Sequence, residues 1–83
     1  MSINATTAGL PSADDLFAEV ARIDLKIDAQ RQFNEAAEAD LASGSLTDAE
    51  RSRSILLIAL RDDFIEEMQI HKALLLRAMA SAQ

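Results

Sequence analysis

The sequence lacks cysteine, tryptophan and tyrosine, and its 83 residues include only two glycines and one proline. Without cysteine, the chain can form neither a disulfide-stapled domain nor a zinc–thiolate site. The scarcity of turn residues argues against a β-sandwich, in which many short strands alternate with turns. The sequence is instead rich in alanine, with 16 residues, and it contains 25 Leu, Ile, Val, Met or Phe residues. This composition predicts an all-α protein.

Acidic residues outnumber basic ones by 14 to 8, which gives a net charge of −6. The imbalance lies in residues 1–50, which contain ten acidic and three basic residues, for a net charge of −7. Residues 51–83 contain four acidic and five basic residues, for a net charge of +1. An acidic surface repels phosphate groups, so the charge disfavours nucleic acid and anionic membranes as partners. It is compatible with a protein partner.

No apolar run is long enough to cross a membrane. The longest, Ile55–Leu60, is followed directly by charged residues, whereas a bilayer core requires about 20 apolar residues. Residues 1–12 hold no Lys or Arg and no apolar core, so they do not resemble a Sec signal peptide. We therefore expect a cytoplasmic protein, or one exported by a non-Sec route, with a flexible N-terminal segment at residues 1–11 and a helical domain at 12–83.

A first helix is predicted at about residues 13–42. Ser12 is suited to cap it, and Asp15, three residues later, completes an Asp version of the capping box. Apolar residues then recur at intervals of four, three and four, which is the spacing of a helix packed on another helix. They are Leu16, Val20, Ile23 and Ile27.

A second helix is predicted at about residues 48–80, after a break around Gly44. Glycine favours the left-handed conformation that often ends a helix, and Thr47 with Glu50 forms a full capping box for the next one. At roughly 100° per residue, this helix has a central apolar stripe. We assign to the contact with the first helix Leu57, Leu60, Phe64, Met68, Leu75 and Met79.

Further apolar residues widen that stripe on both sides, to about half of the circumference, whereas packing on one neighbour requires only about 100°. We predict that these flanking side chains bind a partner: Ile58, Ile65 and Leu76 on one side, Leu56 and Leu74 on the other. The predicted fold is thus an antiparallel two-helix hairpin, completed by self-association or by another protein through the second helix.

The sequence holds no catalytic motif, since it has no Cys, no G-x-S-x-G and no Gly-rich phosphate loop. His71 is the single histidine, and it follows Glu67 by four residues rather than in the E-x-x-H spacing of carboxylate-bridged metal sites. We therefore expect no enzyme, no metal or other cofactor and no small-molecule substrate.

Two functions fit this architecture. The first is a small acidic chaperone or adaptor that covers an apolar helix or groove of a partner. In its small size, acidity and helical hairpin, the chain is similar to bacterial secretion chaperones, including those of type III systems. The second is a self-assembling subunit, such as a homodimeric four-helix bundle or a filament. The chain is similar to type III needle subunits in length and in having two helices around a short loop, but Ser43–Leu46 lacks their P-x-N-P motif. RNA binding, as by Rop-type hairpins, is a third and weaker alternative.

Overall fold

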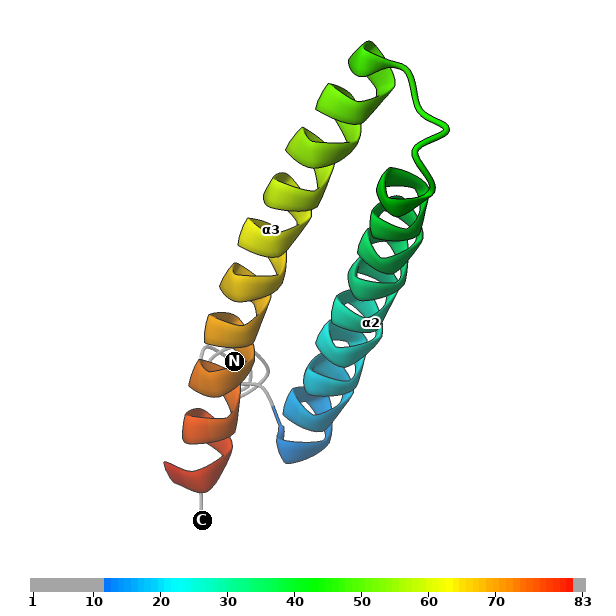
Figure 1. Cartoon of the computed structure of the whole chain (residues 1–83). Coiled ribbons are helices and arrows are strands. Elements are labelled where there is room, and N and C mark those ends of the chain that lie inside the picture. Colours follow the sequence, from blue (N-terminus) through cyan, green and yellow to red (C-terminus); the bar gives the residue numbers. More distant parts are fainter. Residues whose placement is uncertain (1–11, 82–83) are drawn as a thin grey trace, which may run out of the picture.

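The computed structural model describes residues 12–81, which form two α-helices and no strand in that range. Helix α2 covers Ala13–Ser43 and helix α3 covers Asp48–Ser81. The two lie side by side and run in opposite directions, so the chain is the all-α hairpin that the sequence predicts (Figure 1). The segment predicted to be flexible, residues 1–11, lies outside the described residues, as do residues 82–83.

Helix α2 begins at the predicted cap. The Asp15 N–H donates to Ser12 Oγ over 3.1 Å, and the Ser12 N–H donates to Asp15 Oδ2 over 3.3 Å. Each side chain thus satisfies one backbone donor that the first turn of a helix leaves unpaired. Asp14 and Asp15 also place negative charge at the positive end of the helix dipole.

The turn between the helices is also built by local interactions. Gly44 adopts φ 71° and ψ 10°, the left-handed conformation, and its N–H donates to the Leu41 carbonyl over 3.4 Å. On the other side, the Glu50 N–H donates to Thr47 Oγ1 over 3.2 Å and the Thr47 N–H to Glu50 Oε1 over 3.0 Å. This second capping box starts α3 and confirms the predicted break.

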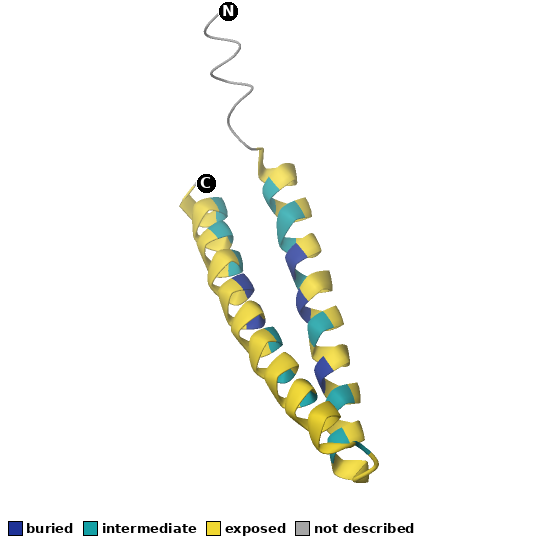
Figure 2. Cartoon of the chain, turned by 90° about the horizontal axis from the view of Figure 1, so that it is seen from above, coloured by how far each residue is buried: buried dark blue, intermediate teal, exposed yellow. Residues whose placement is uncertain are grey.

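The core is a narrow seam between the helices (Figure 2). Its buried apolar side chains are Ile23, Ile27, Ile65 and Met68, with Leu75 packed against them. The inward positions of both helices follow alternating steps of four and three residues, the repeat of coiled coils. On α2 they are Leu16, Val20, Ile23, Ile27, Gln30, Asn34, Ala37 and Leu41; on α3 they are Ser54, Ile58, Arg61, Ile65, Met68, Lys72, Leu75 and Met79.

The structure corrects half of the core predicted for the second helix. Met68, Leu75 and Met79 face α2, but Leu57, Leu60 and Phe64 are exposed by 38%, 55% and 44%. The predicted stripe followed a straight helix with about 3.6 residues per turn, whereas two packed helices keep a repeat of about 3.5. Over three heptads the straight line drifts by about 60°, from the flank of α3 beside the seam to the side that contacts α2, so its first half was misplaced.

Candidate interaction surface

Helix α3 carries a contiguous group of exposed apolar side chains, which we call the outer apolar face. Its members are Leu56, Leu57, Leu60 and Phe64, all classed as exposed although they are large and apolar. Leu57, Leu60 and Phe64 follow one another by three and four residues, and Leu56 precedes Leu60 by four, so neighbouring side chains meet on one helix surface. Exposed apolar patches are a common feature of protein–protein contact sites.

The residues predicted to bind a partner divide between two sides of α3. Ile65 is only 8% exposed and Ile58 is half-buried, because both belong to the seam with α2. Their assignment to a partner surface is therefore wrong. Leu56, Leu74 and Leu76 are exposed by 59%, 53% and 44%. The excess of apolar surface on α3 remains, and it includes three positions predicted to bind a partner and three predicted to lie in the core.

Polar contacts across the hairpin connect α2 with the side of α3 that faces it. Lys72 Nζ lies 2.6 Å from Asp24 Oδ1, and Asn34 Nδ2 donates to Asp62 Oδ1 over 2.9 Å. The Arg61 guanidinium lies 5.4 Å from the centre of the Phe33 ring, within the range of a cation–π contact. Lys72 and Arg61 interrupt the apolar pattern of the seam. Apolar periodicity alone therefore predicts that the outer apolar face, and not this side of α3, packs against α2. Their partners on α2 were the signal that sequence reasoning missed.

A small open recess of about 230 Å³ lies beside the seam. Its lining consists of Arg31, Asn34, Glu35, Glu38, Asp62 and Ile65. Asn34 is 6% exposed, and while its amide nitrogen binds Asp62, its Oδ1 has no hydrogen-bond partner among the described residues. A buried polar atom without a partner lowers stability, so Asn34 is a costly position in the seam.

Two carboxyl groups, those of Glu19 and Glu50, have lowered pKa values. The pKa of Glu19 is below its usual range because Arg22 hydrogen-bonds and pairs with it, at 2.6 Å from Arg22 Nη2 to Glu19 Oε2. The pKa of Glu50 is lowered chiefly by the hydrogen bond from the Thr47 backbone N–H, and further by the Thr47 hydroxyl. Both effects stabilise helix turns and leave these carboxylates ionised at neutral pH.

His71, the single histidine, is exposed on α3. Among residues 12–81, no three His, Asp or Glu side chains converge as they would around a metal ion. Neither of the two described helices has the length and apolar character needed to cross a membrane.

Comparisons of the chain with protein-family models, with curated proteins and with solved structures find no match.

Proposed function

We propose that this protein is a non-enzymatic protein–protein interaction module, with the outer apolar face of α3 as its contact surface. One observation carries the proposal: of the eleven large apolar side chains that are exposed, eight lie on α3 and three on α2. Helix α2 covers one side of α3 and leaves another apolar side in water. Burying that side against a second protein removes apolar area from water, which is the main favourable contribution to association.

A helical partner suits the shape of this surface. The outer apolar face follows one side of a straight helix, with anchors at spacings of three, four and seven residues, as in helix-in-groove recognition. If the partner is a foreign helix, the protein is a chaperone or adaptor, and its small size and acidity are compatible with a secretion system. We keep the cytoplasm, or export by a non-Sec route, as the expected compartment.

Self-assembly is the second candidate. A specific observation favours it. Along α3 a basic residue precedes the outer apolar face and an acidic residue follows it, so two α3 helices that run in opposite directions would bring opposite charges together. In that case the protein is a homodimeric bundle or a structural subunit, and the contact surface is unchanged.

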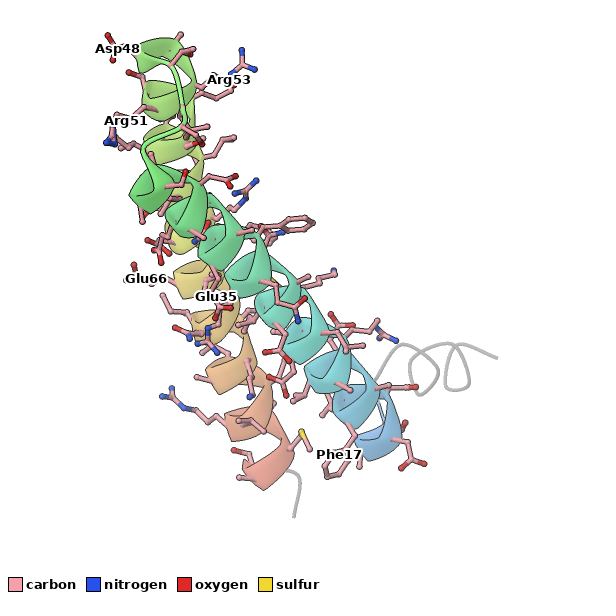
Figure 3. The ribbon with its side chains drawn as sticks, turned by 45° about the vertical axis from the view of Figure 1, so that its right-hand side comes forward. Phe17, Glu35, Asp48, Arg51, Arg53 and Glu66 are labelled. Carbon is pink, nitrogen blue, oxygen red and sulfur yellow. The ribbon has the colours of Figure 1, made fainter. Side chains whose placement is uncertain are left out.

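A photocrosslinking amino acid at position 60, introduced in the native host, tests the contact surface. We expect covalent adducts of defined mass from this position, because Leu60 lies in the centre of the outer apolar face. The matched control places the same amino acid at Glu66, which is exposed on α3 (Figure 3). Glu66 follows Leu60 by six residues, so the helical repeat places it on a different side of α3. Adducts should be absent from position 66 and should disappear from position 60 when Leu57→Asp is added.

Mass spectrometry of the adducts then separates the two forms of the proposal, because it identifies either a foreign protein or a second copy of this chain. Equal yields from positions 60 and 66, or no adduct from either, would refute the outer apolar face as a contact surface.

A further inference from the structure

We propose that the outer apolar face is covered by the same face of a second copy, with the two α3 helices antiparallel around a two-fold axis near Leu60. The inference rests on the proposed function and names the partner. Like most soluble homodimers, the assembly would be symmetric, so that each contact occurs twice. With α2 on each outer side, the dimer is a four-helix bundle, which provides the second packing neighbour that α3 lacks.

Residues of opposite charge lie beyond the two ends of the outer apolar face. Arg53 precedes Leu60 by seven residues, and Glu67 follows it by seven. Seven residues are one heptad, so these three side chains lie on the same line along α3. The line thus carries a positive charge, an apolar centre and a negative charge, symmetric in spacing about Leu60 and opposite in sign.

An antiparallel arrangement pairs these charges correctly. With the two-fold axis near Leu60, Arg53 lies within about one helical turn of Glu67 of the second copy, and the reverse contact is identical. A parallel pair would place Arg53 beside Arg53 and Glu67 beside Glu67. An antiparallel pair centred near Glu67 would bring two carboxylates together and leave Arg53 without its complement. Opposite charges at such flanking positions set partner choice and orientation in helical assemblies.

A second pair extends the pattern outward. Glu50 precedes Leu57 by seven residues and His71 follows Phe64 by seven, so reversal also places Glu50 near His71. One oxygen of Glu50 accepts the Thr47 N–H, which leaves the other able to accept from an imidazole. Asp63 is exposed in the single chain, and it follows Leu56 by seven residues, so it lies on the Leu56 edge of the outer apolar face.

Within one chain, the opposite charges of Arg53 and Glu67 do not form a contact with each other. They stand 14 residues apart on one helix, about 21 Å along its axis, so they cannot contact each other. The ion pairs formed among residues 12–81 are Arg22–Glu19 and Lys72–Asp24, and neither residue takes part in them. Any energetic coupling between Arg53 and Glu67 must therefore arise between two chains.

Charge reversal with rescue tests this coupling in the full-length chain. Sedimentation equilibrium should show a dimer for the natural sequence. Arg53→Glu and Glu67→Arg should each raise the dimer dissociation constant about tenfold or more, since each changes two attractive pairs into repulsive ones. The double variant R53E/E67R should restore most of the affinity. Glu66→Arg, on another side of α3, is the control for net charge and should leave the dissociation constant within about twofold.

Spin-label distances test the orientation, because the natural chain has no cysteine. Single cysteines at Ala59 and Ala73 occupy equivalent heptad positions on one exposed side of α3. An antiparallel dimer centred near Leu60 separates the two labels at position 73 by roughly 36 Å more along the axis than those at position 59. Similar distances at both positions would indicate a parallel dimer and overturn the proposal.

A monomer at all concentrations, or a double variant no tighter than the single ones, would also overturn it. A monomer that still gives position-specific adducts with a foreign protein would refute the second copy alone and leave the proposed function in place.

Discussion

The two helices are similar in length, 31 and 34 residues, but they use their apolar residues differently. Helix α2 has eight large apolar residues among positions 13–42, and its seam becomes polar at Gln30 and Asn34. Helix α3 has 13 among positions 48–80, arranged on two sides. One side packs on α2, and the other, around Leu60, remains exposed. A helix with one apolar side is satisfied by one neighbour, whereas a helix with two requires a second.

The difference also shows that the most apolar side of a helix need not face its nearest neighbour in the chain. The side of α3 that contacts α2 includes Arg61 and Lys72, which interact with Phe33 and Asp24 of α2, beside the buried Ile65. The outer apolar face has no such complement on α2. It is therefore available for an interface between molecules.

The largest expected effect distinguishes a substitution in the seam from one in the outer apolar face of α3. Ile65→Ala should lower the free energy of unfolding by about 2–4 kcal/mol, because it leaves a cavity in the seam. This loss should be the same at every protein concentration. Leu60→Ala should destabilise the protein only at concentrations where it self-associates, since Leu60 is exposed in the single chain. Urea unfolding followed by circular dichroism, at two concentrations a hundredfold apart, measures both. A concentration-independent loss for Leu60→Ala would contradict the distinction.

A smaller effect concerns the polar half of the α2 seam. Asn34→Leu should raise the free energy of unfolding by about 1 kcal/mol, since it removes a buried oxygen that has no partner. Asp62, which loses the hydrogen bond from Asn34, is exposed and can bind water instead. Gln32→Leu, at an exposed position of the same helix, is the control and should change stability by less than about 0.5 kcal/mol. Destabilisation by Asn34→Leu would mean that the Asn34–Asp62 hydrogen bond outweighs the cost of burial.

The smallest expected effect lies at the start of α3. Because the pKa of Glu50 is lower in the folded protein than its ordinary value of 4.5, its stabilising contribution is complete above that value. The contribution is lost as the pH falls through the folded pKa, because the protonated group no longer accepts as a carboxylate. Glu50→Gln should therefore reduce the loss of stability between about pH 6 and about pH 3. Urea unfolding at the two pH values measures it, and an unchanged pH dependence would show that the charge of Glu50 contributes nothing to the second capping box.

Local signals predicted much of this molecule. Ser12 with Asp15, Gly44, and Thr47 with Glu50 each act through a few neighbouring backbone groups, and the structure shows the predicted contacts at each. The helix boundaries consequently agree with the prediction to within one residue. The assignment of residues to the two sides of α3 was less successful, and Ile58, Ile65, Leu57, Leu60 and Phe64 were placed on the wrong sides.

The sequence by itself determined that the chain forms two helices joined by a glycine-capped turn, and that α3 has more apolar surface than one helix can cover. Both properties depend on residue spacing and on interactions within a turn or two. The tertiary structure decided which apolar side of α3 is enclosed. That choice depends on contacts between residues far apart in the chain, such as Asp24 with Lys72, and on the supercoiled path of two packed helices, which the repeat of a single straight helix does not reproduce.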